Sequence, residues 1–272
     1  MRLTSRRHER GFGKLELALL VLLSAVVIAL ALPGRSGIIQ SRIASNELAA
    51  QQALVMIAAA QESWRQEAHV DQDLDTEGEY GLLGELAGRI APRTGEKTVE
   101  YGFIPPLFGT GGREGADGCA VVNGYVFRIF LVREAEEPDR ITVGDDKTLG
   151  GTAAEPGAAL TAVLPVTEFQ RKGYVLYAWP LKTGETGNRA YVVTQAPPVY
   201  QTDMRSGVYS GRGPIGADNV PDVNAAFAEK AFRFDPETGA GIAPDLKATG
   251  RVRNDGNVWQ ATSFRRPAFL NP

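Results

Sequence analysis

An apolar run near the N-terminus constrains this chain more than any other stretch. Between Leu17 and Leu32 the sequence contains one polar side chain, Ser24, and no charged one. With the residues just before it, the run reaches about twenty residues, enough to cross about 30 Å of hydrocarbon as a helix. Four arginines precede it, and such a basic flank stays on the cytoplasmic side of a membrane. We therefore expect a single span, with the N-terminus in the cytoplasm.

A carboxylate lies at the beginning of this run. Counted from Phe12, Glu16 is the fifth residue and Pro33 the twenty-second, and Gly11 comes directly before Phe12. A charged group at the edge of a membrane helix is costly, so it usually has a partner and a role. The spacing of these four positions is therefore the pattern to explain.

The pattern resembles the N-terminal motif of type IV prepilins, the family that includes type IV pilins and the pseudopilins of type II secretion systems. The resemblance implies that a prepilin peptidase cuts after Gly11 and methylates Phe12, the new N-terminal residue. It also implies that Glu16 pairs with the amine of Phe12 on an adjacent subunit of a filament with a helical core. The chain departs from the usual family pattern at Gly13 and Lys14, where Thr and Leu are common.

We expect an α+β fold, in which a long N-terminal helix, membrane-spanning in its first half, packs against a small antiparallel β-sheet head with long loops. One helix is predicted from Phe12 to about Glu67, and two helices broken at Pro33–Gly37 are the alternative. The expected parts are a leader (1–11), a transmembrane and filament-core half of the helix (12–33), an amphipathic half (34–68) and an extracytoplasmic head (69–272).

The amphipathic half carries an apolar stripe suited to packing under a sheet. Its members are Ile39, Ile43, Ala50, Leu54, Ile57 and Trp64. In the head, residues 124–132 are rich in β-branched and aromatic side chains and form the clearest strand. The Asn123-Gly124 pair predicts a tight hairpin with residues 119–122.

Other parts of the head give weaker patterns. Residues 173–180 and 189–194 predict a second hairpin, and residues 79–90 a short helix with Leu82, Leu83, Leu86 and Ile90 facing inward. Residues 134–160 are polar and glycine-rich, which indicates a loop or insertion. Beyond residue 202 the pattern is irregular, apart from a helix predicted over 223–234.

An acidic run follows the long helix. Alternate carboxylates at Asp71, Asp73 and Asp75 can converge on a hard cation such as Ca²⁺, which takes six to eight oxygen ligands. The run does not fit an EF-hand loop, because Thr76 stands at the sixth position and Leu82 at the twelfth. A calcium site and a solvated loop remain the two interpretations, and no other cofactor is expected.

We find no catalytic constellation in the sequence and expect no enzyme activity. The two histidines, His8 and His69, lie in the leader and at the helix end. The pair Asp145-Asp146 and the aromatic residues Tyr174, Tyr177 and Trp179 are better explained by structure than by chemistry. Cys119 is the only cysteine, so no internal disulfide closes the C-terminal loop, as one does in many pilin heads.

The function expected from the resemblance is that of a structural subunit in a type IV pilus-like or secretion pseudopilus filament. Its partners are copies of itself or related pilins, the prepilin peptidase, the inner-membrane assembly machinery and membrane lipid. The net charge of −3 does not indicate the positively charged surface that nucleic-acid binding needs. The head is expected in the periplasm or outside the cell.

Two alternatives stay open. The first is a secreted binding or enzymatic domain behind a conventional signal peptide, for which residues 29–31 offer a small-x-small cleavage site. The second is a signal-anchored protein that does not polymerise.

Overall fold

A computed structural model of the chain describes residues 14–94, 98–111, 118–136, 140–149, 160–246 and 252–262. For residues 14–20 and 22–36, which belong to the first helix, only the backbone is described. The chain forms two compact units, residues 1–42 and 43–272.

The N-terminal helix is α1 (Lys14–Gln66), which contributes residues to both units. It is assigned as one helix through Pro33–Gly37, in agreement with the single-helix prediction and not with two helices. Within the described part of the chain, no helix is long and apolar enough to cross a membrane. The membrane span predicted over 12–33 consists almost entirely of residues that the structure does not describe or describes only by their backbone. It therefore stays a prediction.

The head is built around an antiparallel sheet. Its main path runs β1 (Ala120–Val122), β2 (Tyr125–Ala135), β4 (Val175–Pro180), β5 (Ala190–Thr194), β6 (Tyr200–Thr202) and β9 (Gln260–Ala261). A further strand, β3 (Ile141–Gly144), pairs with the second half of β2, and β7 (Arg233–Phe234) pairs with β8 (Gly241–Ile242) in a separate small sheet. The α+β class with a small antiparallel sheet is confirmed.

Both predicted hairpins are confirmed. In the first, Ala120 lies opposite Phe127, and Asn123 and Gly124 have φ angles of 49° and 75°, the left-handed conformation that a tight two-residue turn requires. In the second, β4 and β5 pair with Tyr177 opposite Val192.

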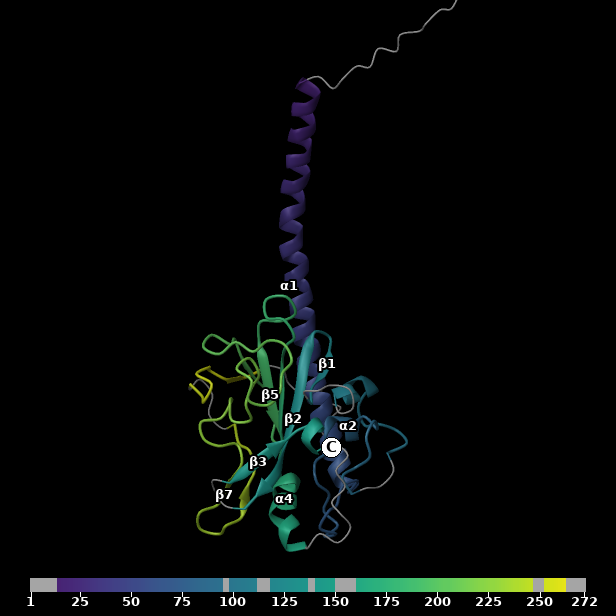
Figure 1. Cartoon of the computed structure of the whole chain (residues 1–272), viewed down its shortest axis with the longest axis vertical. Coiled ribbons are helices and arrows are strands. Elements are labelled where there is room, and N and C mark those ends of the chain that lie inside the picture. Colours follow the sequence, from purple (N-terminus) through teal and green to yellow (C-terminus); the bar gives the residue numbers. More distant parts are fainter. Residues whose placement is uncertain are drawn as a thin grey trace, which may run out of the picture. The chain divides into compact units, whose positions relative to one another are not determined.

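Side chains of the central strands point alternately to the two faces of the sheet, and both faces are buried. On β2, Phe127, Ile129 and Leu131 belong to one apolar cluster, whereas Val126, Phe130 and Val132 belong to another. Figure 1 shows α2 and the lower part of α1 on one side of the sheet and the yellow-green C-terminal segments on the other. We call these the helix-covered face and the coil-covered face.

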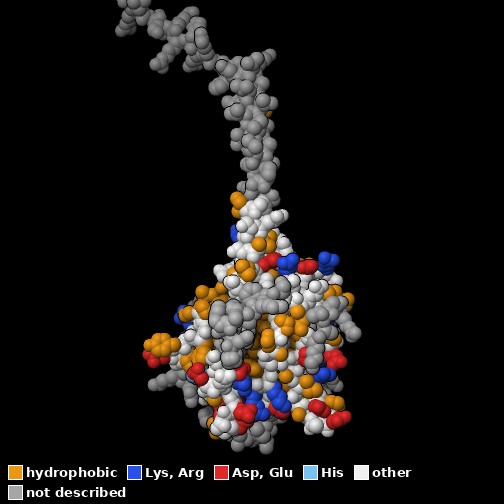
Figure 2. All heavy atoms as spheres, turned by 180° about the vertical axis from the view of Figure 1, so that it is seen from behind, with side chains coloured by type: hydrophobic (Ala, Val, Ile, Leu, Met, Phe, Trp, Pro, Cys, Tyr) orange, Lys and Arg blue, Asp and Glu red, His pale blue; other side chains and the backbone are white. Residues whose placement is uncertain are grey.

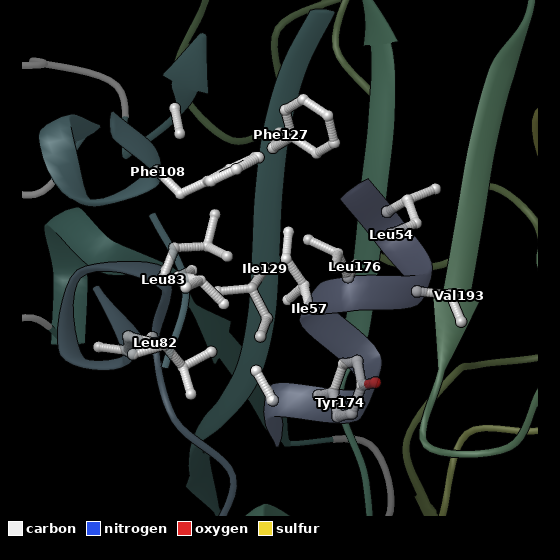
Figure 3. Packing of buried hydrophobic residues seen from close by; sticks show 14 of the residues in the cluster. Leu54, Ile57, Leu82, Leu83, Phe108, Phe127, Ile129, Tyr174, Leu176 and Val193 are labelled. Carbon is white, nitrogen blue, oxygen red and sulfur yellow. The ribbon is translucent and has the colours of Figure 1, made fainter. Parts of the chain in front are cut away.

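The helix-covered face is closed by the second half of α1, by α2 (Leu83–Leu86) and by the 3₁₀ helix η1 (Pro106–Gly111). Leu54, Ile57 and Trp64 on α1 are fully buried, as the predicted stripe requires, whereas Ile39 is 38% exposed. Figure 3 shows Leu54 and Ile57 pointing toward Ile129 and Leu176, with Leu83 and Phe108 alongside.

The coil-covered face is closed by Phe169 from the helix α4 (Leu160–Lys172) and by mostly irregular segments of residues 204–246 and 252–259. The indole of Trp259 is fully buried, lies 5.9 Å from the Tyr177 ring and donates to Asp255 Oδ2 at 3.1 Å. The same oxygen accepts the Tyr209 hydroxyl at 2.7 Å, and Asn257 holds the backbone of Ser206 and Gly207. These polar contacts fasten the C-terminal segments where a disulfide is absent.

The helix predicted over 223–234 is wrong. These residues form turns that end in β7, and Ala225 and Phe227 donate to carbonyls three residues earlier. The Asn224 side chain accepts the N–H of Ala231, and the Tyr177 hydroxyl accepts the N–H of Ala226 at 3.0 Å. Side chains have replaced the helical hydrogen bonds here.

The loop prediction over 134–160 is wrong in part. Residues 134 and 135 continue β2, and the segment contains β3 and α3 (Asp146–Leu149). A helix that was not predicted, α4 (Leu160–Lys172), begins at its end and buries Phe169. The short helix predicted over 79–90 is only four residues long in the structure, where it forms α2 (Leu83–Leu86). The four apolar side chains predicted to face inward are nevertheless buried.

Candidate functional site

The motif residues that predict processing and assembly are outside what the structure describes. Gly11 and Phe12 precede the described residues, and Glu16 and Pro33 lie on α1 at positions where side chains are not described. Cleavage, methylation and subunit pairing at these residues therefore stay predictions.

The structure brings together the three carboxylates of the predicted acidic site. Oxygen atoms of Asp71, Asp73 and Asp75 all lie within 4.8 Å of one another in the loop that follows α1. Asp71 and Asp73 are half-buried, and Asp75 is exposed. Carboxylates this close repel one another unless protons, cations or hydrogen-bond donors compensate their charge.

Hydrogen bonds hold these carboxylates in place. Asp71 accepts the backbone N–H groups of Asp75 and Thr76 at 3.2 and 3.1 Å. Asp73 Oδ2 accepts the hydroxyl of Thr167 on α4 at 2.8 Å. Asp75 pairs with Arg171, whose guanidinium also reaches Glu77 at 3.3 Å. The loop is thus fixed against the C-terminal half of α4.

Glu79 is the least accessible carboxylate of the acidic run, with 1% of its surface exposed. Its Oε1 accepts the backbone N–H of Gln72 at 3.1 Å, and its Oε2 has no hydrogen-bond partner. Burial raises its pKa to about 7, and the charge of Asp73 adds to the rise. The sequence showed Glu79 as part of the acidic run. Only the apolar residues that follow it indicated that its side chain would be buried.

A second group of buried ionisable side chains lies at the start of α2 and was missed by sequence reasoning. Asp146 accepts the N–H groups of Leu83 and Gly84 at 3.0 and 2.8 Å. Glu85 accepts the N–H of Leu82 at 2.7 Å and pairs with Arg93 at 2.8 Å. Burial raises the pKa of Asp146 to about 8, and it also raises that of Glu85, against the opposing charge of Arg93. These carboxylates satisfy the free N–H groups of a short helix, which is a structural role.

The residues weighed for catalysis are placed in structural settings. Asp145 pairs with the buried Arg128 at 3.2 Å, and Asp146 caps α2. Tyr174 belongs to the helix-covered cluster, whereas Tyr177 and Trp179 belong to the coil-covered one, so these three do not form a common surface.

Two open pockets occur in the described part of the head. The larger, about 340 Å³, lies beside β6 and β9 and includes Asp203, Arg205, Val252 and Val258 in its lining. The smaller, about 230 Å³, includes Lys230, Arg233 and Arg253. Figure 2 shows acidic and basic side chains close together at the lower end of the face it presents.

The β4–β5 hairpin loop is attached directly to α1. Asn46 donates to the carbonyl of Thr186 at 2.9 Å, and Glu47 accepts the N–H of Asn188 at 2.9 Å. One turn further along, the amide of Gln51 donates to the Tyr191 hydroxyl at 3.3 Å. Three polar residues on one helix face thus fix the sheet on this part of α1.

Comparisons of the chain with models of protein families, with curated proteins and with solved structures found no match.

Proposed function

We propose that this protein is a structural subunit of a type IV pilus-like or type II secretion pseudopilus filament. The observation that carries the proposal is the spacing of Gly11-Phe12, Glu16 and Pro33 along one apolar helix-forming segment. The antiparallel sheet packed on the later residues of α1 is consistent with the helix-plus-head layout of such subunits.

Two parts of α1 would then serve different purposes. The apolar stripe from Ala50 to Trp64 is buried against the sheet and forms part of the core of the head. The apolar run from Leu17 to Leu32 lies earlier in the sequence, and we assign it to the membrane before assembly and to the filament core afterwards. Moving it between these surroundings keeps apolar side chains out of water.

Glu16 would fix the register between subunits. When it lies beside the amine of Phe12 from a neighbour, two opposite charges compensate each other, and the net gain is small because both lose water. A subunit shifted along the bundle would leave a buried charge without a partner, which costs about 3–5 kcal/mol. The pair therefore selects one stagger and adds little stability.

The decisive experiment is mass spectrometry of the N-terminal peptide of the protein recovered from cells. A chain that starts at Phe12, methylated or not, supports prepilin processing. A start at Leu32 contradicts the proposal in favour of a secreted domain, and an intact Met1 contradicts it in favour of a non-polymerising anchor.

A substitution separates assembly from insertion. Glu16→Ala removes the charge and leaves the apolar run intact, so we expect normal membrane insertion and loss of filaments in sheared-cell fractions. Glu9→Ala in the leader is the control, because that residue is removed with the leader. Normal filaments from the Glu16→Ala variant would rule out the register role.

A further inference from the structure

The smaller pocket of the head gathers charged side chains from parts of the chain that are distant in sequence. Its volume is about 230 Å³, and its wall comes from the segment 227–233, from residues 243–245 and from Arg253. Pockets for drug-sized ligands measure about 300–1,000 Å³, so this one suits a small ion or a single polar group. The ionisable side chains of the wall are Lys230, Arg233, Arg253, Glu229 and Asp245.

The charges of this wall do not balance. Arg233 and Glu229 pair with each other, so their charges compensate. Arg253 and Lys230 then stand against one carboxylate, that of Asp245, which is exposed. The pocket therefore carries net positive charge although the whole chain is acidic.

Arg253 is the buried member of the group. Only 8% of its surface is exposed, and its Nε is enclosed without a hydrogen-bond partner. In the part of the chain that the structure describes, its guanidinium forms no ion pair and donates no hydrogen bond. A guanidinium keeps its charge in proteins, and a buried charge without a partner is costly. An anion in the pocket would remove that cost.

The backbone that carries Arg253 is fastened to the opposite wall. Its N–H donates to the carbonyl of Asn257 at 3.0 Å. The side-chain amide of the next residue, Asn254, donates to the carbonyls of Asn224 and Glu229, each at 3.2 Å. The two walls are therefore joined before any ligand arrives, which lowers the cost of binding.

We propose that this pocket binds a small oxyanion, a phosphate or carboxylate group, through the guanidinium of Arg253. The planar fork of an arginine matches two oxygens of either group. Lys230 is exposed and adds positive charge at the rim of the pocket. Because Asp245 opposes an anion, we expect a dissociation constant on the order of 1 mM. The inference does not depend on filament assembly.

Titration of the purified full-length chain in a non-ionic detergent tests the site. Sodium phosphate and sodium acetate are added separately at constant ionic strength, so the two arms distinguish the two sources of the oxyanion. We expect calorimetry to detect saturable binding of one anion per chain in at least one arm.

Variants locate the binding. Arg253→Gln is expected to weaken it by about tenfold or more, because the buried charged donor is lost. Lys230→Gln, at the exposed rim, is expected to weaken it by about threefold. The matched control is Arg205→Gln, since the Arg205 side chain is 87% exposed and lies outside this pocket. It should bind as the wild type does.

The wild-type titration decides the question even if Arg253→Gln fails to fold. No saturable binding of either anion up to about 30 mM would overturn the proposal, because water alone would then compensate Arg253. Equal weakening by Arg253→Gln and Arg205→Gln would also overturn it, since binding would then reflect general basic charge. Where circular dichroism shows that Arg253→Gln is unfolded, Lys230→Gln takes its place. Weakened binding in that variant supports the site, and unchanged binding contradicts its location.

Discussion

Both faces of the sheet are buried, but by different means. On the helix-covered face, α1 brings Leu54, Ile57 and Trp64 with a backbone that satisfies its own hydrogen bonds. On the coil-covered face, irregular segments bring Trp259 and Phe227 with a backbone that cannot do so.

The difference explains where the polar anchors lie. A buried backbone without regular structure needs partners for its N–H and C=O groups. The Tyr177 hydroxyl meets this need by donating to the Val223 carbonyl and accepting the Ala226 N–H, and Asn257 does the same for Ser206 and Gly207. The coil-covered face therefore depends on single side chains in a way that the helix-covered face does not.

The largest expected effect comes from Trp259→Ala, which removes a large, fully buried side chain from the coil-covered face. The variant loses a fully buried indole and a hydrogen bond to Asp255, so we expect the free energy of unfolding to fall by about 4 kcal/mol. Urea denaturation measures the change. Val258→Ala, next to it and 37% exposed, is the control and should change stability by less than about 0.5 kcal/mol. Similar losses for both variants would contradict the dependence on one anchor.

A pH dependence is expected from the helix-covered face, where Asp146 caps α2. Its pKa is raised to about 8 in the folded state from an ordinary value of 3.8, so the folded chain holds a proton that the unfolded chain has lost between these values. This stabilisation is complete below pH 3.8 and disappears as the pH rises through 8. The raised pKa values of Glu79 and Glu85 act in the same direction.

Unfolding in urea at pH 5 and pH 7 measures this dependence. At about 1.4 kcal/mol per pH unit for one proton, we expect the loss of stability between these values to be about 2–3 kcal/mol smaller in Asp146→Asn than in the wild type. Identical pH profiles for the two proteins would show that Asp146 titrates normally.

A matched pair on β5 compares the two faces directly. Val192 points to the coil-covered cluster and Val193 to the helix-covered cluster, and both are buried. Replacing either with Ala removes the same atoms, so each variant should lose about 2 kcal/mol of stability if the two faces are equally well packed. A loss at Val192 less than half that at Val193, measured by urea denaturation, would show that the coil-covered face is packed more loosely.

Local patterns were sufficient to predict much of the fold. The stripe on α1 and the Asn123-Gly124 turn depend on neighbours a few residues apart, so sequence periodicity identified them. The convergence of Asp71, Asp73 and Asp75 was predicted in the same way, because alternate residues of one loop supply it. The contacts of the acidic site outside its own loop come from Thr167 and Arg171, about a hundred residues later, and no local pattern indicates them.

The missed features depend on distant partners. Ala225, Ala226 and Ala231 favour a helix by propensity, yet the Tyr177 hydroxyl and the Asn224 side chain take hydrogen bonds that a helix would need. The burial of Glu79 follows from its backbone pairing with Val70 and from the contact of Tyr80 with Gln170 on α4. Tertiary contacts decide both cases, so the sequence alone predicted neither.

The position of β9 has a consequence for the order of folding. This strand closes the edge of the sheet against β6, with Tyr200 opposite Ala261, and Trp259 just before it completes the coil-covered face. A nascent chain that emerges from its N-terminus onward has all of α1, α2 and β1 to β5 long before these residues. Part of the coil-covered face therefore stays exposed until residues 259–261 have been synthesised, and during that interval chaperones or aggregation compete with folding.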